Sequence, residues 1–387
     1  MKQSRLALSL YAAAVALYWM AMYFYVPTLS SYARTKTEDL AAIGLALSMY
    51  GLWQMIVRLP LGIAADWLGR RKLFIVLGFV LTGIGALVMG AASDITTIGV
   101  GRAITGWAAA TWVPLLVVFS GLFPPEEAVR ASTTATLISS VARVLATALN
   151  GTLNRLGGYG LAFWVAAIAA AAAILVVLPV REPVRPPKRP SLSGIARLIV
   201  RRDVLLPAVL SAVNQYANWG ATFTFIPILA DQLGASDQVK SLMVSLNLIV
   251  FTVGNLLAQQ IVNRLGARRL SQIGFVLLFI GVGGAALAPN LGLLLVAQVV
   301  IGLSQGIGYP VLMGMSIRYV DDEQRTTAMG LHQSVYALGM FAGPWLSGVL
   351  AEGMGIRAML GVTAWAVIVV GLGLGRLCEQ QPSLPRE

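Results

Sequence analysis

Three arginines stand in stretches of the sequence that are otherwise apolar, namely Arg58, Arg102 and Arg143. A guanidinium group stays ionised and binds carboxylates or phosphates through paired N–H donors, and it is costly to bury in apolar surroundings. We predict that Arg143, helped by Arg102, holds the acid group of a substrate. The alternative is that both bind backbone carbonyls and polar neighbours. Arg58 lies nearer the end of its stretch and is the weaker candidate.

His332 and a group of amide and aromatic residues are further candidates for binding. His332 is the single histidine of the sequence. It could titrate near neutral pH and carry a coupling proton, although a lone histidine is more often structural. Amides and aromatic rings suit an amphipathic organic ligand. The predicted substrate contacts besides the arginines are Trp19, Tyr23, Gln215, Asn218, Gln305 and Tyr336.

Groups for other chemistries are scarce in the sequence. One cysteine, Cys378, and one histidine are too few for a disulfide framework or a structural zinc site. We find no nucleotide-binding loop and no nucleophile elbow. The sixteen acidic residues all fall in polar segments or at the ends of apolar ones. We therefore expect no enzyme activity, no cofactor and no metal.

The composition shows which elements must position these side chains. Of the 387 residues, 57% are hydrophobic and 11% are charged, against about 25% charged in soluble proteins. A membrane-spanning helix needs about 20 mostly apolar residues. Twelve such stretches lie near 6–30, 41–64, 73–92, 96–120, 131–153, 159–180, 204–229, 242–262, 271–288, 291–316, 327–350 and 356–377. We predict an all-α polytopic membrane protein with twelve transmembrane helices.

The basic residues indicate on which side of the membrane each loop lies. The chain has 28 lysines and arginines. With a cytoplasmic N-terminus, the inside segments hold about four times as many as the outside segments, so the positive-inside rule places both termini in the cytoplasm. Lys240 is then expected at the outer surface, where a cysteine should be labelled from outside. Because the basic charge is spread over loops, nucleic-acid binding is disfavoured.

The sequence repeats itself at an offset of 196 to 200 residues. The matching segments are 25–29 with 225–229, 66–72 with 263–269, and 102–114 with 298–310. Between the halves lies a basic, proline-rich stretch. We predict two pseudo-symmetric six-helix bundles, residues 1–180 and 204–387, joined by a cytoplasmic linker with an interfacial helix at 181–203. Parallel six-helix repeats with a binding site between them are typical of alternating-access transporters.

Two motifs resemble signatures of the major facilitator superfamily. Residues 62–71, Gly-Ile-Ala-Ala-Asp-Trp-Leu-Gly-Arg-Arg, resemble its loop 2–3 signature, with Trp67 where an arginine is usual. Residues 102–106, Arg-Ala-Ile-Thr-Gly, resemble its helix 4 signature. The resemblance covers the whole chain. It implies gating roles for Gly62, Asp66, Gly69, Arg70 and Arg71.

Within this signature, Gly62 should allow close helix packing. The resemblance implies that Asp66 meets the start of the predicted helix 327–350 when the protein is open to the outside. The alternative is that Asp66 only organises a basic turn.

Two predicted helices carry further patterns. The predicted helix 327–350 contains Gly343 and Pro344 in a spacing that resembles the antiporter signature, which exporters of the superfamily carry in their fifth helix. We predict that this pair takes part in gating, with close packing and a proline bend as the alternative. The predicted helix 131–153 has a polar face that should line a cavity or the bundle interior, formed by Thr136, Ser139, Arg143, Thr147 and Asn150.

The resemblance implies a multi-pass secondary active transporter of the cytoplasmic membrane that works by alternating access. The arginines favour a small anionic, zwitterionic or amphipathic solute as its substrate. One alternative is a broad exporter of apolar compounds, and another is a sensor or lipid scramblase that transports nothing. We expect a monomer whose partners are the solute and the bilayer. The coupling ion and the direction of transport stay open.

Overall fold

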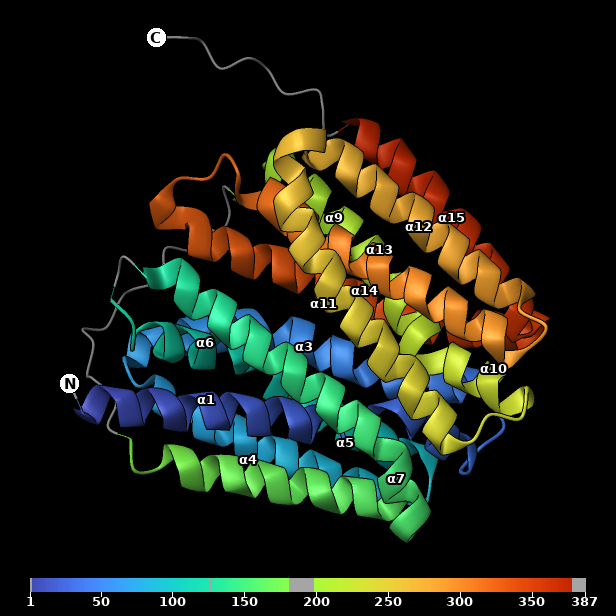
Figure 1. The fold of residues 1–387 in the computed structure, drawn as a ribbon, viewed down its shortest axis with the longest axis horizontal. Helices are drawn as coiled ribbons and strands as arrows, with labels where there is room; N and C mark the ends of the chain where they lie inside the picture. Colours follow the sequence, from blue (N-terminus) through green and yellow to red (C-terminus); the bar gives the residue numbers. More distant parts are fainter. Residues whose placement is uncertain (1, 125–126, 181–197, 378–387) are drawn as a thin grey trace.

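The computed structural model describes residues 2–124, 127–180 and 198–377, which form helices and turns without strands (Figure 1). The first half contains α1 (Lys2–Tyr23), η1 (Val26–Thr28), α2 (Leu29–Arg34), α3 (Leu40–Leu68), α4 (Arg71–Gly90), α5 (Ile95–Ala110), α6 (Trp112–Ser120) and α7 (Ala128–Val177). The second half contains α9 (Arg202–Ala217), η3 (Asn218–Phe225), α10 (Ile226–Gln232), α11 (Asp237–Leu265), α12 (Ala267–Leu287), α13 (Leu291–Ile317), α14 (Asp322–Met354) and α15 (Ile356–Leu377). Most of the predicted linker lies outside the described residues.

The helices confirm an all-α polytopic membrane protein. Ten helices of the described chain are long and apolar enough to cross a membrane. The predicted span 131–153 and all but the last three residues of 159–180 fall within α7, where the chain turns back at the non-helical Gly157 and Gly158 (Figure 1). The predicted span 204–229 is divided among α9, the π-helical η3 and α10, and it is not one of the ten. The count of twelve is therefore not reached by length and composition alone.

Equivalent helices of the two halves begin and end with the same kinds of residue. Side chains that accept a backbone N–H start α3, α5, α11 and α13, and glycines with a positive φ end α3 and α11. The equivalent residues, 196 or 197 positions apart, are Asp39 and Ser236, Asp94 and Asn290, and Gly69 (φ 63°) and Gly266 (φ 79°). An L side chain rarely adopts such a φ, so glycine is the residue suited to both turns.

Packing inside each bundle follows the same repeat. A Cβ added to Gly106 would lie 2.9 Å from Cα of Tyr50, and one added to Gly302 would lie 2.5 Å from the carbonyl oxygen of Asn247. Only glycine permits these approaches of α5 to α3 and of α13 to α11.

The two bundles are in contact at one end of the molecule and apart at the other. At the end that carries the N-termini of α3 and α11, a Cβ on Gly348 would lie 3.0 Å from Cα of Gly44, and one on Gly151 would lie 2.6 Å from Cα of Gln238. We call this end the closed face. At the opposite end, a Cβ on Gly62 would meet nothing within 4 Å. The predicted close packing at Gly62 is wrong for this conformation because the bundles are separated there.

Candidate functional site

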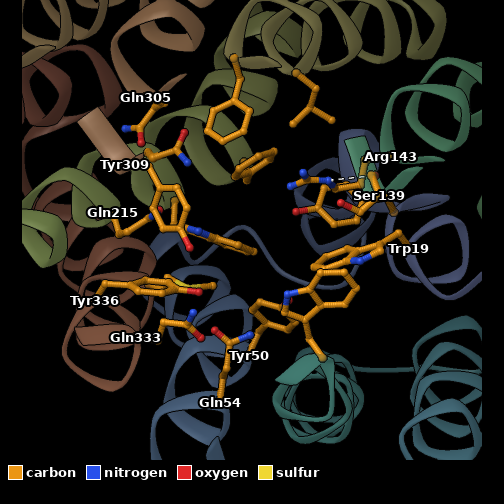
Figure 2. Close-up of a pocket in the computed structure, with 18 of the residues that line it drawn as sticks. Trp19, Tyr50, Gln54, Ser139, Arg143, Gln215, Gln305, Tyr309, Gln333 and Tyr336 are labelled. Carbon is orange, nitrogen blue, oxygen red and sulfur yellow. Dashed lines mark hydrogen bonds between the residues drawn. The ribbon is translucent and has the colours of Figure 1, made fainter. Parts of the chain in front are cut away.

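A cavity of about 210 Å³ lies between the bundles and is lined by 22 residues (Figure 2). The first bundle contributes side chains from α1, α3, α6 and α7, and the second contributes side chains from α9, η3, α11, α13 and α14. Figure 2 shows Arg143, Ser139 and Trp19 on one side, opposite Gln215, Gln305 and Tyr309. A pocket with aromatic walls and a few polar groups between two domains is a typical site for a small organic ligand.

Sequence reasoning and structure agree on most of the lining. The structure brings together seven of the eight predicted substrate contacts: Arg143, Trp19, Tyr23, Gln215, Asn218, Gln305 and Tyr336. The predicted polar face of α7 also points inward. Thr136, Ser139 and Arg143 line the cavity, and the Thr147 and Asn150 side chains bond α11.

Arg102 is the predicted substrate contact that does not line the cavity. Its side chain is 4% exposed, and its guanidinium carbon lies 4.2 Å from the ring centre of Tyr50 and 5.9 Å from that of Trp219. Tyr50 and Trp219 themselves line the cavity and stack on each other with 5.0 Å between their ring centres. Arg102 therefore does not line the cavity in this conformation, because the stacked rings take the lining position, and its contact with substrate stays a prediction.

Arg143 is held by its own helix and by aromatic rings. Its Nε donates to the Ser139 carbonyl at 3.2 Å and its Nη2 to the Ser140 hydroxyl at 3.3 Å. The guanidinium carbon lies 5.1 Å from the ring of Trp19 and 5.9 Å from that of Phe251. These contacts orient the group by cation–π attraction and leave N–H donors for a ligand. Among the described residues, no carboxylate pairs with it.

Arg58 is a second arginine of the cavity lining, although its place near the end of an apolar stretch makes it the weaker candidate in the sequence. It is 5% exposed, its Nη1 donates to the Tyr336 hydroxyl at 2.9 Å, and its Nε has no partner. It lies on one face of α3 with Tyr50 and Gln54, at intervals of four residues, and all three line the cavity. This i, i+4, i+8 spacing was the signal in the sequence that could have found it.

His332 lies behind the cavity wall, buried within the second bundle. Its Nδ1 is 2.7 Å from the Ser316 hydroxyl, and that hydroxyl donates to the Val204 carbonyl at 2.9 Å. A serine hydroxyl has one hydrogen, so His332 Nδ1 is the donor in the first bond. Its Nε2 is then the unprotonated nitrogen, and it is buried without a partner. Its ring centre is 6.4 Å from that of the cavity residue Tyr336.

An ionic cluster of the second bundle forms hydrogen bonds to the first bundle at the closed face. Lys240 is 3% exposed, and its Nζ lies 2.5 Å from Asp231 Oδ1 and 2.8 Å from Asp237 Oδ1. From the first bundle, the Ser31 hydroxyl donates to Asp231 at 2.6 Å and accepts from Lys240 at 2.9 Å. Asn154 Nδ2 donates to Asp237 at 2.9 Å. The expected exposure of Lys240 is therefore wrong here, because Ser31 and its neighbours cover it.

The predicted gating residues have mixed outcomes. Gly69 ends α3 in the left-handed conformation, and Arg70 follows it before α4 begins at Arg71. A Cβ on Gly343 would lie 3.1 Å from the backbone nitrogen of Gly220, so this part of α14 packs closely on η3. Close packing at Gly343, with Pro344 inside the helix, is thus confirmed, whereas gating stays a prediction. The Asp66 side chain lies outside the described residues.

The family is decided by a match over nearly the whole chain. The family model of the Major Facilitator Superfamily matches residues 11–214 and 208–384. The chain belongs to the Major Facilitator Superfamily. This membership agrees with the repeated halves and the cavity between them, and it makes the protein a multi-pass membrane transporter.

Other members of the superfamily are similar in sequence or structure. An uncharacterized superfamily transporter of Methanocaldococcus jannaschii, MJ1560, is 21% identical over 360 residues, 90% of this chain and 92% of that protein. The inner membrane transport protein YajR of Escherichia coli is 26% identical over 152 residues, 39% of this chain and 33% of that protein, so that match spans a third of the relative's length. A bacterial homologue of the human lysosomal transporter Spinster, in an inward-facing, occupied conformation, superposes with a TM-score of 0.80 at 16% identity, covering 96% of each chain.

Proposed function

We propose that this superfamily member is a secondary active transporter that moves a small organic anion or zwitterion across the cytoplasmic membrane. The observation that carries the proposal is the charge of the cavity. Among its described lining residues, Arg58 and Arg143 are ionised and none is a carboxylate. Two cations without a counter-ion favour an acid group and repel a cationic solute.

The acid group would be held mainly by Arg143. A guanidinium fork matches a carboxylate in shape, and a hydrogen bond between charged groups is worth about 1.5–3 kcal/mol. Arg58 keeps its Nε without a partner and adds positive potential from α3. The aromatic rings beside Arg143 exclude water and strengthen this attraction.

The direction in which the cavity opens follows from the predicted topology. If both termini are cytoplasmic, the closed face is the outer face and the separated ends of the bundles face the cytoplasm. The structure would then represent the inward-facing state of an alternating-access cycle. In this proposal the functional unit is a monomer, with the bundles 1–180 and 204–387 as its two moving parts.

His332 is the candidate for binding a coupling proton. Its unpartnered Nε2 can accept a proton, and its neighbour Tyr336 is bonded to Arg58. A proton there would therefore be felt electrostatically at the substrate site. His332→Gln should abolish uptake driven by a pH gradient and spare substrate-for-substrate exchange. Loss of both activities, or of neither, would count against this role.

Transport of matched compounds by purified protein in liposomes tests the proposal. We would screen organic acids together with their uncharged amides and their amine analogues, first by thermal stabilisation and then by uptake. Acids should be selected. Arg143→Lys keeps the charge but loses the fork, so affinity should fall, and Arg143→Gln should reduce it about 10- to 100-fold.

The matched control is Arg155→Gln, which removes an exposed arginine from the same helix outside the cavity and should change nothing. If amides and amines were transported as well as acids, a broad exporter of apolar compounds would replace the proposal. If no compound crossed the membrane, a sensor or scramblase would.

A further inference from the structure

The cavity is chemically different on its two sides. Both arginines come from the first bundle, on α3 and α7. Most of the lining amides come from the second bundle, among them Gln215, Asn218 and Gln305, and Figure 2 shows Gln215 and Gln305 across the cavity from Arg143. A ligand whose acid group meets Arg143 therefore presents its other end to amide groups.

Some of these amides are already used by the protein and others are not. Asn247 donates to the Gln298 carbonyl at 2.9 Å, and Gln305 donates to the Asn214 carbonyl at 3.2 Å. By contrast, three amide oxygens of the lining are buried without a partner: those of Gln54, Gln215 and Asn218. A buried, unpartnered carbonyl oxygen is costly, and a ligand O–H or N–H would relieve that cost. Neither arginine donates to any of these three oxygens in the structure.

Aromatic rings line the space between these polar groups. Trp19 packs edge-to-face on Trp112 with 5.2 Å between ring centres, and Tyr50 stacks on Trp219 at 5.0 Å with 23° between the planes. Such faces favour a flat conjugated ring, which gains stacking contacts that a flexible alkyl chain does not. The Trp19 Nε1–H is also buried without a partner, on the same side as Arg143, and can add a second bond to an acid group.

We infer that the substrate is an aromatic or heteroaromatic acid that carries a hydroxyl or N–H donor on the side of the ring away from the acid. This inference rests on the proposed function and narrows it. The acid group binds Arg143, with Trp19 beside it, the ring lies between the aromatic walls, and the donor binds Gln215 or Asn218.

Two matched pairs of probes test the inference. 4-Hydroxybenzoate and 4-methoxybenzoate share the acid and the ring but differ in the O–H donor. Indole-3-acetate and 1-methylindole-3-acetate differ in the N–H donor. We expect the donor-bearing member of at least one pair to bind the purified protein at least tenfold more tightly, by calorimetry and by competition for uptake. In Gln215→Leu/Asn218→Leu this preference should shrink to less than threefold, with the affinity for the methylated member little changed.

The control is Gln232→Leu, an exposed amide on α10 outside the cavity, which should keep the preference. If acids bind but neither pair shows a preference, or if aliphatic acids bind and aromatic acids do not, the inference is overturned and the proposed function stands. If the preference survives the double substitution, the assignment to Gln215 and Asn218 is overturned. If no acid of any kind binds, the proposed function fails as well.

Discussion

Ser31 is the clearest place to test what keeps the closed face shut. Its hydroxyl donates to Asp231 at 2.6 Å and accepts from Lys240 at 2.9 Å, so one side chain of the first bundle makes two bonds to ions of the second. Ser31→Ala removes both bonds without adding bulk. The ion pair between Lys240 and Asp231 lies within the second bundle and can persist, so the substitution weakens the contact between bundles selectively.

The expected size of the effect follows from these bonds. A hydrogen bond to a charged group is worth about 1.5–3 kcal/mol, and part of that value is recovered when water replaces Ser31 in the open state. We take a net loss of about 1.5–2 kcal/mol for the two bonds together. At 1.4 kcal/mol per factor of ten, the ratio of closed to open face should fall about 10- to 30-fold. Asn154→Ala removes the bond to Asp237 and should add to the effect, although not independently, because both side chains bond one ion cluster.

Double electron–electron resonance can measure this ratio. Ala91 and Leu287 are exposed and lie at the C-terminal ends of the equivalent helices α4 and α12. Spin labels at these positions would report the width of the closed face in a variant whose Cys378 is replaced by serine. Ser31→Ala should increase the population at longer distances. Ser93→Ala, an exposed serine at the same face that bonds only Asp94, is the control. An unchanged distance distribution for Ser31→Ala, or an equal change for the control, would refute the assignment of Ser31 to this contact.

Three further predictions concern the closed face, the start of α5 and the end of α3. In Gly151→Val the Cβ of the new side chain would lie 2.6 Å from Cα of Gln238, so the closed face should fail to shut and transport should fall at least tenfold. Gly160→Val is the control on the same helix, and it should be tolerated because a Cβ there meets nothing within 4 Å. The hydrogen bond from the Thr97 N–H holds the pKa of Asp94 below its ordinary value. The ionised carboxylate therefore stabilises the start of α5, fully so at a pH above the pKa that Asp94 has in the unfolded chain. The difference in melting temperature between wild type and Asp94→Ala should be largest at neutral pH and disappear as the pH falls through the folded-state pKa of Asp94. By resemblance to the superfamily, Asp66→Asn should favour the inward-open state more than tenfold through loss of a contact worth about 1.5–3 kcal/mol, and equal distance distributions in the same resonance experiment would leave Asp66 as a residue of the basic turn only.

The sequence by itself determined the helices, their repeat and much of the cavity lining. An apolar stretch in lipid must satisfy its backbone internally, so composition and length fix the helical class. The offset of about 197 then predicts pairs of equivalent residues, and the caps at Asp94 and Asn290 confirm it, because a helix start depends on a few neighbouring residues. The polar face of α7 was equally local, since residues three and four apart share a helix side.

Only the tertiary structure decided which cations face the cavity. Arg102 and Arg143 look alike in sequence, but Tyr50 and Trp219 stack between Arg102 and the cavity, whereas the rings around Arg143 leave its donors available. Lys240 was expected at the surface and is buried, because Ser31, over 200 positions away, contacts it from the other bundle. Such outcomes depend on contacts between helices distant in the sequence, and the spacing of residues along one helix does not contain that information.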